Sequence, residues 1–325
     1  MKHITSEERH TIDHLLRQGQ TITSIAKQLS RASSTISREL KRNRDMRNGD
    51  YRYDLAERKA QKRKINKARR QSYTPKIQDY VQEKLKLKYS PEQIVGAAQR
   101  DGLACVSHET IYRKIWRDQH RGGGLYEDLR NQGKRYRKRG AAKDNRGKIR
   151  NRQDIDRRPK IVEARERLGD LEVDLVIGSG HQGVLLTIND RVTGCVMIEQ
   201  LNNKQAEGVS DAIIKRLSPF KNRLHTITSD NGKEFAEHEK VAQALQIDFY
   251  FAKPYHSWQR GSNENLNGLI RQYIPKEQNI SLLTPQFIAE VEQALNDRPR
   301  KRHQFLSPQN IHDQLINQQP VALVS

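Results

Sequence analysis

The stretch LHTITSD, residues 224–230, is a short apolar run that ends in a carboxylate, Asp230. A second acid, Glu264, lies within GSNENLNGLIRQYIPK, a stretch that favours a helix. A third, Asp174, lies in LEVDLVIG (171–178), which predicts a strand. Acids on two strands and on a following helix can converge on divalent metal. Two cations held in this way can activate a water molecule and stabilise a leaving oxygen in phosphoryl transfer.

The elements around these acids follow a recognisable order. Turn residues separate three apolar runs, which predicts an antiparallel meander, and helical and extended patterns then alternate. This order predicts a mixed sheet with helices on its faces, as in a ribonuclease-H-like α/β core. The predicted strands are 171–178, 183–190, 193–201, 224–230 and 247–252, and the predicted helices are 203–217, 234–246, 259–272, 284–296 and 307–317.

Charge is divided unevenly along the chain. The 325 residues include 60 Lys and Arg against 39 Asp and Glu, a formal net charge of +21. Residues 1–160 hold 42 of these basic and 19 of these acidic side chains, so residues 161–325 hold the other 18 and 20. A basic half joined to a near-neutral half predicts a polyanion-binding region attached to a separately folded core. We expect DNA binding that weakens steeply as salt rises.

Cysteine and hydropathy patterns argue against a zinc-binding protein and against a membrane protein. The two cysteines, Cys105 and Cys195, form no CxxC pattern, and the histidines are scattered, which argues against a zinc site. The sequence has no run of 18 or more apolar residues and begins without the apolar core of a signal peptide. We therefore expect a reducing, cytoplasmic setting and no membrane partner.

Residues 1–50 predict a helix-turn-helix DNA-binding domain. An amphipathic helix over 5–18 precedes two short helices within TITSIAKQLSRASSTISRELKRN, which break near residues 30–32. Short hydroxyls and long cations on the outward face of the second short helix suit base edges and phosphates. The outward residues that we expect to contact DNA are Ser34, Thr35, Arg38, Lys41 and Arg42.

Two further basic stretches follow. Residues 51–70 predict a basic helix, on which Lys62 either follows a DNA backbone or belongs to a solvated connector. We group this helix with the module that follows it, as a region over 51–120. Residues 121–165 include GGG and a run of basic and polar residues that cannot bury enough apolar surface to fold alone, so they predict a flexible linker lying along DNA.

The second helix pair begins at Ser90. The tetrapeptide SPEQ provides an N-cap, a proline at the first helical position and a capping-box glutamine. Ser107 is the expected cap of the next helix. This pair is either a second DNA-binding module, with His108 and Arg113 as candidate contacts, or an element for dimerisation or packing.

Several stretches spread over nearly the whole chain share one resemblance: TSIAKQLSRASSTISREL, SPEQIVG, VSHETIY, LEVDLVIGSGHQGVLLTINDR, TSDNGKEF and YFAKPYHSWQRGSNENLNGLIRQYIPK. They closely resemble the insertion-sequence 30 family of bacterial transposases. The resemblance implies a DDE catalytic core of the retroviral-integrase type over residues 166–325 and places the catalytic, metal-binding triad on Asp174, Asp230 and Glu264. It implies Mg²⁺, for which Mn²⁺ can substitute, and a homodimer or higher oligomer on double-stranded DNA, namely the element's terminal inverted repeats and target DNA. Such a protein is expected to be bacterial and nucleoid-associated.

One departure from the family pattern precedes the first aspartate. The family carries His-Trp-Glu-Gly where this chain has residues 170–173, Asp-Leu-Glu-Val, so local packing is expected to differ. Glu172 and Asp174 lie two apart and share a strand face. Asp174 is the better ligand candidate, because it lies mid-strand among apolar residues, where a bare carboxylate is costly without a cation.

Lesser candidates surround the triad. Glu234 is either a supporting residue or an ordinary early-helix acid, and Arg271, seven residues after Glu264, is a candidate phosphate contact. The segment 255–258 either positions a DNA end or packs. The sequence thus predicts a DNA transposase, and the alternatives are a DNA-binding regulator with an inactive nuclease core and a structure-specific nuclease.

Overall fold

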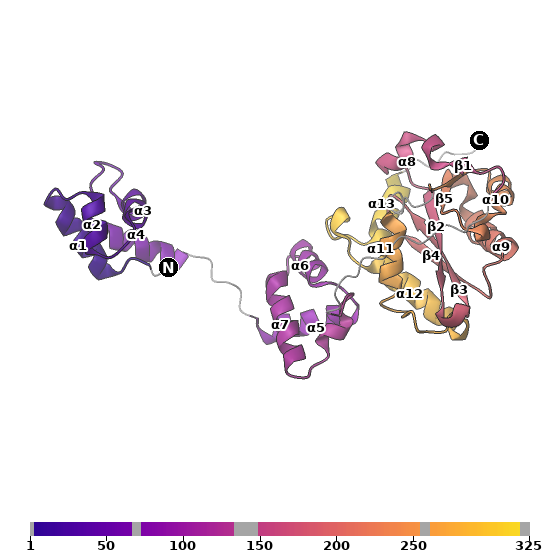
Figure 1. The fold of residues 1–325 in the computed structure, drawn as a ribbon, viewed down its shortest axis with the longest axis horizontal. Helices are drawn as coiled ribbons and strands as arrows, with labels where there is room; N and C mark the ends of the chain where they lie inside the picture. Colours follow the sequence, from indigo (N-terminus) through magenta and orange to yellow (C-terminus); the bar gives the residue numbers. More distant parts are fainter. Residues whose placement is uncertain (1–2, 67–72, 133–148, 254–260, 319–325) are drawn as a thin grey trace. The chain divides into compact units, whose positions relative to one another are not determined.

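The computed structural model describes residues 3–66, 73–132, 149–253 and 261–318, and the chain divides into two compact units, Met1–Arg70 and Gln71–Ser325. The described part of the first unit is helical throughout its regular structure (Figure 1). Its core joins Ile12, Ile25 and Ile36, all fully buried. Its helices are α1 (Ser6–Arg17), α2 (Ile22–Gln28), α3 (Ser33–Asn43) and α4 (Tyr53–Asn66).

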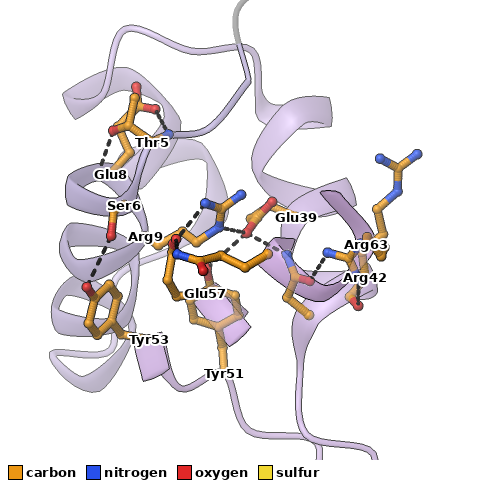
Figure 2. Close-up of polar contacts among 12 residues, drawn as sticks. Thr5, Ser6, Glu8, Arg9, Glu39, Arg42, Tyr51, Tyr53, Glu57 and Arg63 are labelled. Atoms are coloured by element: carbon orange, nitrogen blue, oxygen red, sulfur yellow. Dashed lines mark hydrogen bonds and ion pairs between the residues drawn. The ribbon is translucent and has the colours of Figure 1, made fainter. Parts of the chain in front are cut away.

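A buried glutamate organises the polar side of this unit (Figure 2). Glu39, on the inner face of α3, accepts hydrogen bonds from Arg9 Nε at 2.7 Å, Asn43 Nδ2 at 2.6 Å and Tyr51 Oη at 3.2 Å. Arg9 also donates to Glu57 of α4 at 3.1 Å. Burial raises the pKa of Tyr51, and the Glu39 carboxylate raises it further. The network holds α3 against α1 and α4.

Cations of α4 satisfy the C-terminal end of α3. Lys59 donates to the carbonyl of Arg44 at 2.7 Å, and Arg63 donates to the carbonyl of Arg42 at 3.3 Å. A helix C-terminus attracts cations because its last carbonyls lack intrahelical partners. The sequence predicts that the basic helix of residues 51–70 belongs with the module that follows it. In the structure this helix, α4, belongs instead to the first unit, and some of its cations stabilise the helix-turn-helix.

We predict that Glu39→Gln lowers the free energy of opening of the first unit by about 1.5–3 kcal/mol, because it weakens a charged hydrogen bond to a buried arginine. Hydrogen exchange of the α3 amides in the full chain measures this loss. Glu7→Gln on the exposed side of α1 removes the same charge, and its effect should stay within about 0.5 kcal/mol. Equal protection of α3 in the two variants would contradict the role of Glu39.

The second unit begins with a helical module, residues 73–132. Ser90 and Ser107 cap two of its helices as the sequence predicts. Ile94, Ile111 and Ile115 are among its most deeply buried residues. Its elements are α5 (Pro75–Lys86), α6 (Pro91–Arg100), α7 (His108–His120) and the short 3-10 helix η1 (Leu125–Asp128).

A mixed sheet follows, with strand order β1-β6-β5-β2-β3-β4 in the described residues. The β2–β3–β4 meander is antiparallel, and β2, β5, β6 and β1 pair in parallel. This is the mixed sheet of a ribonuclease-H-like fold. The strands are β1 (Gln153–Asp154), β2 (Asp170–Ile177), β3 (Val184–Asp190), β4 (Val196–Leu201), β5 (Thr226–Ser229) and β6 (Asp248–Phe251); the helices are α8 (Lys160–Ala164), α9 (Ala206–Leu217), α10 (His238–Leu245), α11 (Gly261–Ile270), α12 (Pro285–Asp297) and α13 (Pro308–Gln318).

Helices cover both faces of this sheet (Figure 1). Leu171 and Val173 of β2 pack into the core formed with α9 and α10. Val176 packs into the other core, formed with α11 and α12. Because alternate strand residues share a face, the even-numbered residues of β2 project toward α11. Asp174 is therefore on the α11 side.

Part of the predicted linker is folded. β1 pairs with β6, with Gln153 opposite Tyr250, and Val162 of α8 is fully buried. A two-residue polar strand has no periodicity, and its pairing partner lies about a hundred residues further along the chain, so no local pattern predicts it. Residues 133–148 of the predicted linker lie outside the described residues.

The helical module contacts the end of the α/β domain within the second unit. Gln93 of α6 donates to the carbonyl of Pro299 at 2.6 Å and accepts from Arg298 Nε at 3.0 Å. The ring of Phe305 lies so close to Gly96 that a β-carbon there would be 2.3 Å from it. This face of α6 is a packing surface, which agrees with the alternative that the second helix pair is an element for dimerisation or packing.

Among the helices of the described ranges, none combines the length and the hydrophobicity needed to cross a lipid bilayer.

Candidate active site

Asp174 lies within β2, and Asp230 directly follows β5, the strand that pairs with β2 in parallel. Glu172 of β2 lies opposite Thr228 of β5. If this register were continued by two residues, Asp230 would be level with Asp174 and on the same face of the sheet. The topology thus brings two of the predicted residues to adjacent strands.

Two asparagines, one helical turn apart, fasten α11 to β2. Asn267 donates from Nδ2 to Oδ2 of Asp174 at 2.7 Å, and the buried Asn263 donates to the carbonyl of Val173 at 3.4 Å. Asparagine is a poor helix former, so these contacts give a physical reason for its use here. Glu264, next to Asn263, is exposed on a helix whose place beside Asp174 is fixed.

The loop after β5 holds Asp230 in a turn. Asp230 Oδ1 accepts from the backbone N–H of Gly232 at 2.9 Å, and Ser229 Oγ donates to the Asp230 carbonyl at 2.9 Å. The amide of Asn231 donates to the carbonyl of Ala252, at the end of β6. The Asp-Asn-Gly sequence is therefore both a turn and a support for the carboxylate.

The other acids of β2 have arginine or hydroxyl partners. Glu172 forms an ion pair with Arg191, and their side chains are 0% and 2% exposed. Asp170 accepts from Thr226 Oγ1 at 2.8 Å and pairs with Arg167 at 2.8 Å. The residues that depart from the family pattern are thus stabilised by local partners. Glu172 shares the face of Asp174, but it belongs to a buried ion pair.

Sequence reasoning did not single out Arg130, which also lies at this site. Its Nη1 donates to Oδ1 of Asn265 on α11 at 2.7 Å. Burial lowers the pKa of Arg130, and the Glu264 carboxylate opposes that shift. No local pattern distinguishes this arginine from the other cations of the basic half, because its partner lies 135 residues away.

The oxygen donors here fit a hard divalent cation by their chemistry. Asp174 is half-buried, and beside it the buried Oδ1 of Asn267 has no hydrogen-bond partner among the described residues. Mg²⁺ and Mn²⁺ prefer such oxygen ligands. Within the described ranges, however, no three His, Cys, Asp or Glu side chains already lie close enough together to hold a metal.

The lesser candidates have varied surroundings. Arg271 donates from Nη2 to the carbonyl of Ile177 at 2.6 Å, so its guanidinium supports the backbone, and its contact with phosphate remains a prediction. A β-carbon at Gly232 would lie 2.3 Å from the Glu234 carboxyl carbon, which places Glu234 over the Asp230 turn. The predicted contact segment 255–258 lies outside the described residues.

The predicted DNA-contacting residues lie on accessible surfaces of both units. On α3, Arg38 lies along the helix and donates to the carbonyl and Oγ of Ser34 at 2.9 and 3.1 Å. On α7, Arg113 donates to Thr110 at 3.2 Å. Arg113 is exposed, whereas Ile111 and Ile115 of the same helix are buried in the core of the module. The exposed candidates are Ser34, Arg38, Lys41, Arg42, Lys62, His108 and Arg113, and Thr35 is half-buried.

A helix-turn-helix unit joined to a ribonuclease-H-like α/β unit defines a DNA-binding protein with a nuclease-type fold. Residues 1–43 match a family model described as a helix-turn-helix domain. The transposase for insertion sequence element IS4351 of Bacteroides fragilis is 52% identical over 324 residues, with 100% of this chain and 99% of that protein covered.

The transposase InsI for insertion sequence element IS30A of Escherichia coli K12 is 33% identical over 328 residues, covering 95% of this chain and 83% of that protein. The chain belongs to this family, the insertion-sequence 30 transposases. Among solved structures, the catalytic core domain of BIV integrase is similar over 46% of this chain and 99% of that chain, with 16% identity and a TM-score of 0.37.

We predict that Asn267→Asp destabilises the second unit at pH 7 by about 1–2 kcal/mol, because two ionised carboxylates would face each other where an amide now donates at 2.7 Å. Thermal unfolding at pH 7, without metal, measures this deficit. Asn267→Ala removes the same hydrogen bond but adds no charge, so its deficit should be smaller. An equal deficit in the two variants would contradict the repulsion.

Proposed function

We propose that this protein is a DDE transposase that binds the terminal inverted repeats of its insertion sequence and catalyses metal-dependent strand cleavage and strand transfer. The observation that carries the proposal is the parallel pairing of β2, which contains Asp174, with β5, which Asp230 follows, together with the hydrogen bond from Asn267 of α11, the helix of Glu264, to Asp174. Membership of a transposase family supports the same function.

DNA recognition and chemistry belong to different parts of the chain in this proposal. The cationic and hydroxyl residues of α3 read the element ends, and the exposed face of α7 adds contacts through His108 and Arg113. Lys62 contacts the DNA backbone. A homodimer or higher oligomer brings two element ends and the target DNA together, and this substrate places the protein on the nucleoid, in the cytoplasm.

The carboxylates of Asp174, Asp230 and Glu264 would hold Mg²⁺, or Mn²⁺ in its place. When bound, such ions favour attack by water or by a 3′-hydroxyl and stabilise the leaving oxygen of each in-line displacement. Asn267 orients the Asp174 carboxylate, and the turn at Asn231 and Gly232 orients that of Asp230. Cleavage leaves a 3′-hydroxyl on the element, and that hydroxyl then attacks a target phosphodiester.

We predict that Asp174→Asn, Asp230→Asn and Glu264→Gln each abolish strand cleavage and strand transfer with Mg²⁺ or Mn²⁺ while leaving end binding intact. Each change keeps the side-chain shape and removes a negative charge. Gel assays on labelled element ends measure both reactions, and mobility shifts measure binding.

Asp211→Asn is a suitable control, because this exposed acid of α9 pairs with Lys240 in solvent. Glu172→Gln is unsuitable, since it would disturb the buried pair with Arg191. Near-normal strand transfer by a triad variant, or wild-type activity in excess chelator, would refute the proposed mechanism.

We predict that Arg38→Ala reduces the preference for element ends over unrelated DNA, with a cost of about 1–3 kcal/mol if the guanidinium makes a bidentate base contact. Lys62→Ala should weaken binding to both DNAs alike, because a phosphate contact carries no sequence information. Competition binding at fixed salt separates the two effects. An unchanged preference for element ends in Arg38→Ala would exclude sequence reading by α3 through Arg38.

A further inference from the structure

Arg130 reaches α11 from the helical module. Its neighbour Leu129 is buried in the core of that module, so the backbone of this segment is anchored. The guanidinium donates from Nη1 to Oδ1 of Asn265 at 2.7 Å, and Nη2 lies 3.4 Å from the Asn265 carbonyl oxygen. Both contacts are made to the residue that follows Glu264, and they fix the direction of the guanidinium.

Gly268 makes room for this guanidinium. A β-carbon at this position would lie 2.0 Å from Nη2 of Arg130 and 2.8 Å from its Cζ. Gly268 comes four residues after Glu264, so the two positions lie on the same side of α11. Glycine is unfavourable within a helix relative to alanine, and here its lack of a side chain lets the arginine lie against the helix backbone.

We propose that Arg130 is a substrate-contacting residue of the active site, which binds a DNA phosphate beside Asp174, Asp230 and Glu264. The proposal rests on the proposed transposase function. Arg130 is exposed, and its planar guanidinium has five N–H donors, more than its contacts with Asn265 use. A guanidinium matches phosphate geometry and partly offsets the repulsion between the acids and a polyanionic substrate.

The test compares three full-length variants: Arg130→Ala, Arg130→Lys and Gly268→Ala. The alanine at 268 displaces the guanidinium but leaves the arginine in the chain. Its matched control is Gly208→Ala on α9, where a β-carbon would meet no atom within 4 Å. Thermal unfolding checks that each variant folds, and strand transfer of pre-cleaved element ends gives the rate.

We expect Arg130→Ala and Gly268→Ala to lower the rate by roughly 10- to 100-fold, the range for loss of one charged hydrogen bond. Arg130→Lys should retain part of the activity, Gly208→Ala should retain all of it, and the Arg130→Ala/Gly268→Ala double variant should be no slower than Arg130→Ala. Neutral methylphosphonates placed singly near the DNA end should identify one phosphate whose substitution slows the wild type but does not further slow Arg130→Ala.

A normal rate for Arg130→Ala overturns the proposal. The proposal is also overturned if every methylphosphonate slows Arg130→Ala by the same factor as it slows the wild type. Calorimetric titration of Mn²⁺ into the protein without DNA tests the other possible role. Weaker Mn²⁺ binding by Arg130→Ala would show that Arg130 acts through Glu264 and would also overturn the phosphate contact. Asp230→Asn is assayed in parallel: its activity would refute the transposase mechanism, whereas its inactivity beside a fully active Arg130→Ala refutes only the assignment of Arg130.

Discussion

The hydrogen bond between Asn267 and Asp174 is the constraint on which the geometry of the site depends. Apolar residues such as Leu266 and Ile270 pack α11 onto the sheet, but burial of apolar surface is non-directional and sets the rotation of the helix only coarsely. The two amides, at Asn263 and Asn267, do fix it, because a hydrogen bond weakens steeply when its geometry changes. The same contact supplies a polar partner to a half-buried carboxylate that would be costly to leave without one.

The surroundings of β2 show how one strand face can carry several acids. Glu172 and Asp170 are compensated by arginines, in ion pairs with Arg191 and Arg167. Asp174 accepts from the neutral amide of Asn267. Removing either partner of a buried ion pair leaves the other charge buried without its partner, at a high cost in stability, so such a pair suits a structural role. An amide orients a carboxylate without adding a positive charge, which is compatible with the metal-ligand role proposed for Asp174.

Local signals in the sequence predicted most of the fold. The meander, the strands β5 and β6 and the helices α9 to α13 follow from apolar periodicity, and Ser90 and Ser107 marked helix starts, because each signal lies within a few residues. The two-residue β1 and the Arg130–Asn265 contact depend on partners far along the chain, and no periodicity encodes such partners. For the same reason, sequence patterns indicate the candidate acids but not the asparagine contacts that orient them.

The contacts of the helical module bear on its proposed role in DNA recognition. Gln93 and Gly96 join α6 to the segment after α12, and Arg130 joins the end of the module to α11, all within one compact unit. The exposed face of α7 is therefore carried by the same unit as Asp174, whereas α3 belongs to the other unit. DNA bound by α7 would meet the carboxylates in an arrangement set by packing within the unit. In the proposed function α3 reads the element ends from the first unit, so sequence reading and placement of the reacting phosphate are assigned to different units.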